Sequence, residues 1–233
     1  MKDLELTPRL RAIGSQVPQG AKLADVGTDH AYLPVWLLLN GRIQSAIASD
    51  VKEGPLLRGR ETARTYGVEE NMTFRLCDGL NGIEPKEVDT VVIAGMGGEL
   101  IARILEAAPW TRNAALLLQP MSSQPELRQW LTENGYRIHR ETVAAEGRKL
   151  YTILSVTGGE STPYTQAELW AGRQRKGENA PHRLAYLDDL ISRRERAIAG
   201  MRKGVSNGEE VEREEALLTA LLKLREEWKS WQQ

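Results

Sequence analysis

The fold of this chain is set by the sequence LADVGTDHAYLP at residues 23–34. The stretch starts in a short apolar strand expected over 22–26, turns at Gly27, and enters an apolar helix expected over 31–40. A glycine between a strand and a helix lets the backbone approach a ligand closely. Because ligands of open α/β sheets bind outside the carboxyl ends of the strands, this turn is the first candidate binding site.

Strands and helices alternate on both sides of this stretch. Further strands are expected over 43–49, 72–76, 88–94 and 114–119, and further helices over 6–17, 53–66, 98–107 and 124–134. The alternation predicts parallel βαβ units in a doubly wound sheet. The last two strands, 136–145 and 149–157, are joined by a segment too short for a crossover helix, so we expect a hairpin. The sequence therefore predicts an α/β fold whose sheet is mostly parallel with an antiparallel last strand.

The composition changes after the sheet. The sequence GGESTP at 158–163 is typical of a linker, and two long amphipathic helical patterns follow over 181–203 and 209–231. A short connection between two helices favours an antiparallel hairpin. The predicted division is a sheet domain over 1–160 and a coiled-coil-like helical hairpin over 161–233.

Overall composition limits the possible functions. The chain has 233 residues, is 41% hydrophobic and has a formal net charge of −1, so any surface for nucleic acid has to be local. One cysteine excludes an intrachain disulfide, and the three histidines lack ligand spacing, so we expect no metal site. No apolar run approaches the ~18 residues of a membrane span, and no signal peptide is visible. These features predict a cytoplasmic protein without membrane contact.

Phosphate-binding motifs are missing from the glycine turn. Only the first glycine of G-x-G-x-x-G is matched, by Gly27, and no Walker pattern is present. A ligand without phosphates suits a loop that carries acids, and Asp25 and Asp29 flank the glycine. S-adenosylmethionine is such a ligand, because it is cationic at its sulfur and at its amino group.

The next three strand ends fit an adenosine. Asp50 is placed to bridge the two ribose hydroxyls. Asp78, followed by Gly79, can accept from an adenine amino group. The sequence AGMGG at 94–98 forms an open turn in which Met96 offers a soft apolar surface to a planar base. Aspartate and glycine are ordinary turn residues when they occur singly. Their joint placement at the strand ends predicts an adenosine-containing ligand.

These motifs closely resemble the bacterial tRNA (adenine-22 N1)-methyltransferase family, TrmK. The resemblance covers nearly the whole chain and rests on VGTDHAYLP at 26–34, SDV at 49–51, CDGL at 77–80, IAGMGG at 93–98, LLLQP at 116–120 and GRKLYTIL at 147–154. It implies a Rossmann-like class I methyltransferase fold with seven strands, S-adenosyl-L-methionine as methyl donor, and N1 of adenine 22 of tRNA as acceptor.

The resemblance also implies which residues contact the cofactor. They run from the methionine end, through the ribose and adenine, to the position of the methyl group: Asp25, Gly27, Thr28, Asp29, His30, Asp50, Asp78, Gly79, Gly95 and Met96. Many enzymes that methylate base amino groups have a D/N-P-P-Y/F motif after the fourth strand. This chain has AGMGG there, as the family does, which favours a ring-nitrogen acceptor.

The acceptor chemistry points to one catalytic residue. Adenine N1 already has a lone pair, so no strong base is required, and the product is a cation. A carboxylate that accepts from the N6 amino group would favour the developing charge. Asp29 is the candidate, and the alternative is that Asp29 only contacts the cofactor or caps its loop.

Contacts with RNA are expected from basic and aromatic residues. Between 171 and 203 basic residues outnumber acids, whereas from 209 to 233 acids outnumber basic residues. The basic arm either binds phosphates or pairs with its acidic partner arm. The RNA-binding candidates are Arg9, Tyr151, Arg193 and Arg194. Tyr151 stacks on the target base or packs in the strand, and Gln119, at the end of the fifth strand, hydrogen-bonds the base or finishes the strand.

Other functions stay open at this point. The chain is a tRNA methyltransferase, a methyltransferase of another RNA or a small molecule, or a non-catalytic RNA-binding protein with a vestigial cofactor pocket. The sequence also leaves open whether the protein is a monomer or a homodimer formed through the helical hairpin.

Overall fold

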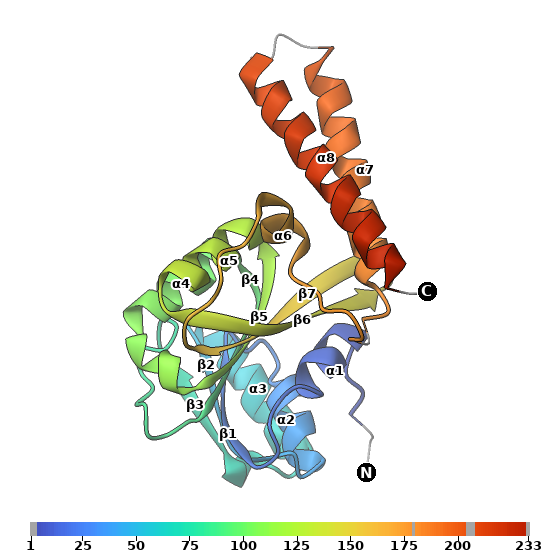
Figure 1. Ribbon diagram of the computed structural model, residues 1–233. Coiled ribbons are helices and arrows are strands. Elements are labelled where there is room, and N and C mark those ends of the chain that lie inside the picture. The colour runs from blue at the N-terminus through green and yellow to red at the C-terminus, as the bar shows by residue number, and fades with distance from the viewer. Residues whose placement is uncertain (1–3, 179, 204–207, 232–233) are drawn as a thin grey trace.

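The computed structural model describes residues 4–178, 180–203 and 208–231. Its main body is built on a seven-stranded sheet in the order β3-β2-β1-β4-β5-β7-β6 (Figure 1). The strands are β1 (Ala21–Val26), β2 (Ile43–Asp50), β3 (Met72–Leu76), β4 (Thr90–Gly97), β5 (Ala115–Ser122), β6 (Tyr136–Glu146) and β7 (Lys149–Gly158).

The predicted strand directions are confirmed. The pairs among β1 to β5 are all parallel, whereas β7 is antiparallel to both β5 and β6. The tight turn after β6 includes Gly147, whose φ is +60°, a conformation that favours glycine. The second strand of this hairpin, β7, lies between β5 and β6, so the two long strands of the hairpin close one side of the sheet.

Helices cover both faces of the sheet. The elements are α1 (Pro8–Gly14), α2 (Tyr32–Leu39), α3 (Glu53–Thr65), η1 (Glu69–Asn71), α4 (Gly98–Ala107), η2 (Pro109–Asn113), α5 (Gln124–Glu133), α6 (Gln166–Ala171), α7 (Arg183–Met201) and α8 (Gly208–Ser230). One core cluster contains residues of α4 and α5, and a second contains residues of α1, α2 and α3. Along β4, Val91 and Ile93 belong to the first cluster and Val92 to the second, as the alternation of a strand requires. This strand is therefore buried on both faces of the sheet.

The first helix is shorter than the expected 6–17. Thr7 caps it, because its Oγ1 accepts from Leu10 N over 3.4 Å, and Pro8 follows as the first helical residue. The helix ends at Gly14, but Leu6 and Val17 outside it are still buried in the core. The apolar residues at helical spacing over 6–17 are therefore core residues, and the first and last of them lie outside the helix.

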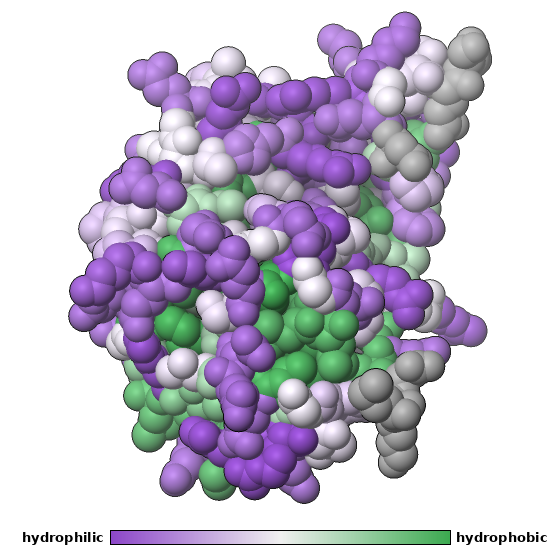
Figure 2. Space-filling model, turned by 90° about the horizontal axis from the view of Figure 1, so that it is seen from below, coloured by the Kyte–Doolittle hydropathy of each residue, from purple (hydrophilic) through white to green (hydrophobic). Residues whose placement is uncertain are grey.

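The surface is largely polar, with local exceptions. Seen from below, hydrophilic side chains surround a central group of hydrophobic ones (Figure 2). The sequence of α2, YLPVWLLL, is apolar on almost every side; it buries Leu33, Val35 and Leu37 and leaves Leu39 exposed. None of the helices in the described ranges combines the length and hydropathy that a membrane crossing needs.

Two long helices, α7 and α8, lie side by side and project from the main body (Figure 1). Ion pairs fix their direction: Asp188 near the start of α7 contacts Arg225 near the end of α8 over 2.5 Å, and Arg202 after α7 contacts Glu215 over 2.5 Å. The predicted antiparallel pair is thereby confirmed, while most of the predicted turn over 204–208 lies outside the described residues.

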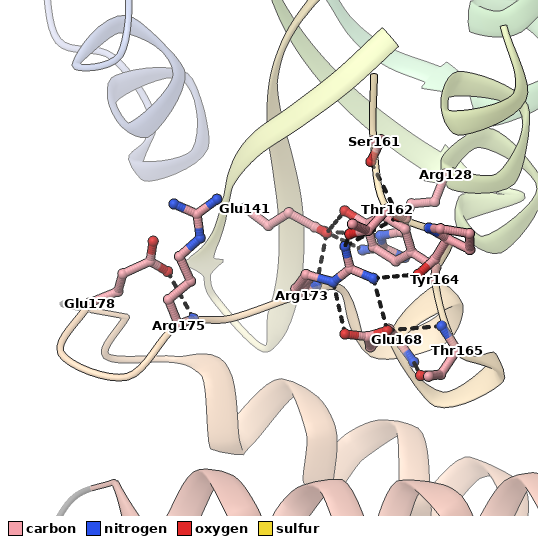
Figure 3. A network of polar contacts seen from close by, with 11 residues as sticks. Arg128, Glu141, Ser161, Thr162, Tyr164, Thr165, Glu168, Arg173, Arg175 and Glu178 are labelled. Carbon is pink, nitrogen blue, oxygen red and sulfur yellow. Dashed lines mark hydrogen bonds and ion pairs between the residues drawn. The ribbon is translucent and has the colours of Figure 1, made fainter. Parts of the chain in front are cut away.

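A buried polar network anchors the C-terminal segment to the sheet domain (Figure 3). Arg128 of α5 donates from Nε to Glu141 Oε2 of β6 over 2.9 Å and from Nη1 to the carbonyl of Leu169 over 2.6 Å. Glu141 Oε1 also accepts from Tyr164 Oη over 3.3 Å and from Arg173 N over 2.9 Å. Burying Arg128 and Glu141 is tolerable because each charge has an opposite partner and further hydrogen bonds. The network crosses the predicted division at 160 and 161, and that division stays a prediction.

Candidate active site

Two adjoining cavities lie at the carboxyl ends of the parallel strands. The first, here called the turn cavity, has a volume of about 360 Å³ and is lined by α1, the β1–α2 turn, Ala94 and Gly95. The second, the strand-end cavity, has a volume of about 100 Å³ and is lined by residues that follow β2 and β3 and by α4. Gly27 lines both cavities, so they adjoin at the glycine turn.

The predicted cofactor residues come together around these cavities. Those at the turn cavity are Asp25, Gly27, Thr28, Asp29, His30 and Gly95. Those at the strand-end cavity are Asp50, Asp78, Gly79 and Met96, in addition to Gly27. Arg9, predicted as an RNA contact, also lines the turn cavity. The structure therefore brings the predicted residues together at the strand ends, where ligands of such sheets bind, and their contact with a cofactor stays a prediction.

Gly27 has two reasons to be glycine. Its φ is +74°, and a Cβ there would lie 2.1 Å from Met96 Cε. The turn is held against β2, because Gly27 N and Thr28 N both donate to the carbonyl of Ser49, over 2.8 and 3.0 Å. Met96 therefore packs directly over the glycine, at the junction of the two cavities.

Asp25 and Thr28 form the buried polar end of the turn cavity. Burial raises the pKa of the Asp25 carboxyl to about 6, and the Thr28 hydroxyl nearby limits the rise. The Thr28 Oγ1 is itself buried and has no partner that meets hydrogen-bond geometry among the described residues. A ligand that brings an ammonium group and a polar atom would stabilise the ionised carboxylate and satisfy this hydroxyl. These residues fit the amino acid end of S-adenosylmethionine.

Asp29 lies at the mouth of the turn cavity and is already paired. Its side chain is 69% exposed, and its Oδ1 accepts from Arg58 Nη2 of α3 over 2.5 Å. The Arg58 guanidinium lowers the pKa of this carboxyl, so Asp29 is ionised. Sequence reasoning missed Arg58, because it belongs to an exposed helical face and to no motif. An Asp29 that accepts from a base amino group has to share its carboxylate with Arg58.

An aromatic pair borders the same mouth. The rings of His30 and Tyr32 stack with centroids 5.1 Å apart and planes at 5°. Between them, Ala31 adopts a left-handed φ of +54° and is buried. Such a backbone costs about 1–2 kcal/mol in a residue with a Cβ, and strain of this kind persists where surrounding structure enforces it. The sequence carries no sign of this conformation, because alanine is a normal helix residue.

A chain of hydrogen bonds connects α1 with the turn after β4. Arg9 Nη1 donates to Gln119 Oε1 over 2.8 Å, and Gly95 N donates to the same oxygen over 3.2 Å. Gln119 is fully buried, and its Nε2 donates to the carbonyl of Pro120 over 3.0 Å. The sequence left two roles open for Gln119, a hydrogen bond to the base or the end of the strand. In the structure its side chain does something further, because it holds Arg9 and Gly95 in place.

Arg9 also contacts Tyr151, which is distant from it in the sequence. The guanidinium carbon of Arg9 lies 5.4 Å from the centre of the Tyr151 ring on β7, a cation–π arrangement. The structure therefore brings together two of the four predicted RNA contacts beside the turn cavity.

The other two predicted RNA contacts, Arg193 and Arg194, lie on α7 and line neither cofactor cavity. Arg193 is 66% exposed and pairs with Asp189 over 2.6 Å. Arg194 is largely buried between Glu214 of α8, 2.9 Å away, and the ring of Trp170, 3.7 Å away. Arg194 thus pairs with the acidic arm, which was one of the two alternatives for the basic arm. RNA contact by either arginine stays a prediction.

The sheet order, with β7 reversed, and the acids at the strand ends define a class I methyltransferase. A family model described as "Methyltransferase domain" matches residues 6–154, and the chain belongs to that family. It is 37% identical over 175 residues to the tRNA (adenine(22)-N(1))-methyltransferase of Bacillus subtilis, with 74% of each chain covered. The chain is thus a member of the tRNA (adenine(22)-N(1))-methyltransferase family, as its motifs predicted.

Solved structures agree with this membership. A Streptococcus pneumoniae protein in complex with S-adenosyl-L-methionine is 34% identical, with a TM-score of 0.84 over 95% of this chain and 100% of that one. The Bacillus subtilis m1A22 tRNA methyltransferase TrmK is 29% identical, with a TM-score of 0.79 over 98% of this chain and 99% of that one. The similarity therefore extends through the C-terminal helices as well as the sheet domain.

Proposed function

We propose that this protein is an S-adenosylmethionine-dependent methyltransferase that modifies N1 of adenine 22 in tRNA. The observation that carries the proposal is the pair of cavities joined at Gly27, with a buried acid at one end and acids after β2 and β3 at the other. A ligand that is cationic at one end and an adenosine at the other matches this arrangement.

The cofactor would be held along the strand ends. Asp25 and Thr28 face its amino acid part, Asp50 its ribose hydroxyls, and Asp78 with Gly79 its adenine. When bound, S-adenosylmethionine supplies an electrophilic methyl group on a sulfonium sulfur. The glycine turn lets the backbone approach this centre closely, and the Met96 side chain of the AGMGG turn lies beside it.

The target adenine would enter from the side of Arg9 and Tyr151. Arg9 is held by Gln119 and by the Tyr151 ring, so its charge is preorganised beside the cavity for a phosphate of the extruded nucleotide. Asp29 is placed to accept from the adenine N6 amino group, which favours positive charge on the base as N1 is methylated. No proton has to leave N1, so the reaction needs no strong base.

The C-terminal helices would contribute to tRNA binding. Arg193 is exposed on α7 and becomes available to a phosphate when its ion pair with Asp189 breaks. Arg194 acts by fixing α7 to α8 and to Trp170. We place the reaction in the cytoplasm, treat 1–160 and 161–233 as the catalytic and helical domains, and expect either a monomer or a homodimer through the helical pair.

The direct test is methyl transfer from labelled S-adenosylmethionine to unmodified bulk tRNA, followed by nucleoside digestion and mass analysis. We expect 1-methyladenosine. A product methylated at N6, or no tRNA product despite cofactor binding measured by calorimetry, would contradict the proposal and direct attention to another RNA or a small molecule. Absence of cofactor binding would favour a non-catalytic RNA-binding protein.

A further inference from the structure

A third cavity, here called the hairpin cavity, lies apart from the cofactor cavities and has a volume of about 530 Å³. Its walls come from the end of β5, the start of α5, the β6–β7 turn, α6 and α7. It thus lies where the sheet domain meets the projecting helices. It shares no lining residue with the turn cavity or the strand-end cavity.

The charge of this cavity is positive. Arg148 and Lys149 on the β6–β7 turn and Arg193 on α7 line it, against one acid, Glu126. Arg193 is paired with Asp189. Arg148 and Lys149 are both exposed, and no acid in the described ranges forms an ion pair with either one; Glu146, the cross-strand neighbour of Lys149, lies close enough for the lysine to help lower the pKa of the glutamate. Two cations that no acid contacts directly within those ranges therefore face one end of the cavity.

The start of α5 adds donors at the same end. Its N-cap residue, Ser123, has a left-handed φ of +50° and makes no side-chain capping bond. The first-turn N–H groups of a helix lack partners within the helix and carry its positive dipole, which favours anions. In α5, Gln124 and Glu126 supply such N–H groups, whereas Pro125 has none. Ser122 and Ser123 also line the cavity, and the Ser123 hydroxyl donates to Glu99 Oε1 over 3.4 Å. The cations, the Ser122 hydroxyl and the two N–H groups together suit a phosphate.

Part of the cavity wall is aromatic. Trp170 of α6 and Tyr186 of α7 both line the cavity. Tyr186 is held by a hydrogen bond from its hydroxyl to Gln124 Oε1 over 2.7 Å, and Trp170 by the Arg194 guanidinium 3.7 Å away. Trp170 is only partly buried, so its ring offers a surface on which a nucleic acid base can stack. Tyr186 is 6% exposed and closes the wall behind it.

The hairpin cavity is separated from the turn cavity by a thin wall. Tyr151 lines the hairpin cavity, and Arg9, stacked on the Tyr151 ring, lines the turn cavity. The AGMGG turn at 94–98 also lies against the start of α5, because a Cβ on Gly98 would lie 2.3 Å from the carbonyl oxygen of Ser123. The turn cavity and the hairpin cavity thus lie close together, with Arg9 and Tyr151 between them.

We propose that the hairpin cavity binds a nucleotide that flanks the target adenine in the RNA. Its phosphate lies at Arg148, Lys149 and the start of α5, and its base or ribose lies against Trp170 and Tyr186. This inference rests on the proposed function and adds a second nucleotide site to it. The site lets the enzyme hold the RNA strand on one side of the target while the adenine is out of its stack.

The test is a double charge reversal, Arg148→Glu with Lys149→Glu, in the full chain. Filter binding to unmodified tRNA over a salt series should show affinity at least about tenfold lower and a salt slope shallower by about two. Calorimetric affinity for S-adenosylmethionine should stay unchanged, which also shows that the variant folds. The matched control is Lys86→Glu with Arg103→Glu, two exposed basic residues that line none of the three cavities, and it should keep wild-type tRNA affinity.

A second variant tests occupancy rather than charge. Met121 is 49% exposed and lines the cavity, so Met121→Trp would fill part of it without altering charge. We expect tRNA binding to weaken in Met121→Trp and to remain near wild type in Met121→Leu. Wild-type tRNA affinity and salt slope in the charge-reversal variant, or wild-type affinity in Met121→Trp, would overturn the inference. A wild-type chain that does not bind tRNA would instead remove the proposed function itself.

Discussion

Arg9 Nη1 donates to Gln119 Oε1 over 2.8 Å, and this hydrogen bond joins the first helix to the end of the fifth strand beside the candidate active site. The Gln119 oxygen also accepts from Gly95 N, in the turn that follows β4. One buried amide thus fixes both a cation and a backbone segment around the cavity, so its removal should disturb substrate and cofactor differently.

Replacing Gln119 with leucine should reduce turnover more than cofactor binding. The variant leaves the Arg9 guanidinium and Gly95 N–H without their acceptor, and an unsatisfied buried group costs about 1–3 kcal/mol. We expect kcat to fall while calorimetric affinity for S-adenosylmethionine changes little. Gln119→Glu keeps an acceptor oxygen for both donors and should retain more of the activity. Equal activities of the two variants would show that holding Arg9 is unimportant.

Gly27→Ala should weaken cofactor binding about tenfold, because the left-handed φ strains a residue with a Cβ by about 1–2 kcal/mol and the turn that lines both cavities would shift to relieve the strain. The new Cβ would also clash with Met96 Cε. Gly41→Ala is the control, because Gly41 has a φ of +59° and no described atom within 4 Å of the position that a Cβ would take. It should lower stability and leave cofactor affinity unchanged.

Asp29→Ala should retain cofactor binding and lose most turnover, as expected for a carboxylate that contacts the adenine. The Arg58 pair lowers the pKa of Asp29, so kcat of the wild-type enzyme at saturating cofactor should hold into mildly acidic solution. In Arg58→Ala the pKa of Asp29 rises, and the acid limb of kcat against pH should move to higher pH. Equal loss of cofactor binding and turnover in Asp29→Ala would reduce Asp29 to a cofactor contact.

Cofactor affinity should fall as the pH drops through about 6. Burial raises the pKa of Asp25 to about 6, so the carboxyl of the free protein is protonated below that pH and ionised above it. A cationic amino group binds the ionised form, and binding therefore releases a proton in the acidic range. Calorimetry between about pH 5 and about pH 8, in buffers of different ionisation enthalpy, measures this release. Asp25→Asn should abolish it, and a wild-type affinity that is independent of pH would argue against contact between Asp25 and the amino group.

Glu141→Gln should destabilise the protein by about 3–5 kcal/mol, because it leaves the buried Arg128 without a counterion. Both side chains are almost fully buried, with exposures of 0% for Arg128 and 2% for Glu141. Urea unfolding followed by circular dichroism measures the change. Glu69→Gln, which removes a more exposed pairing with Arg64, should change stability little. Similar losses in both variants would contradict the anchoring role of the network.

The sequence predicts the sheet and the strand-end residues well because both follow from local rules. Asp50 and Asp78 end neighbouring parallel strands, and parallel strands present their carboxyl ends on one side of a sheet. The contact of Arg58 with Asp29 could not be predicted in this way, because it depends on how α3 packs beside the glycine turn.

Contacts between distant segments explain the rest of what the sequence left open. Arg9 and Tyr151 meet only because β7 inserts between β5 and β6 and carries Tyr151 towards α1. Arg193 and Arg194 are adjacent in sequence, yet one is exposed and the other is enclosed by Glu214 and Trp170. Helix periodicity gives the side of α7 on which each lies, but the packing of α8 and α6 decides which charge is covered.

Methyl transfer to adenine 22 is best tested with two tRNA transcripts that differ only at nucleotide 22, the position named for the Bacillus subtilis relative. One transcript has adenine at that position and the other has guanine. We expect incorporation of one methyl group per adenine-22 transcript, recovered as 1-methyladenosine, and none into the guanine-22 transcript. Equal incorporation into both transcripts would contradict the proposed function.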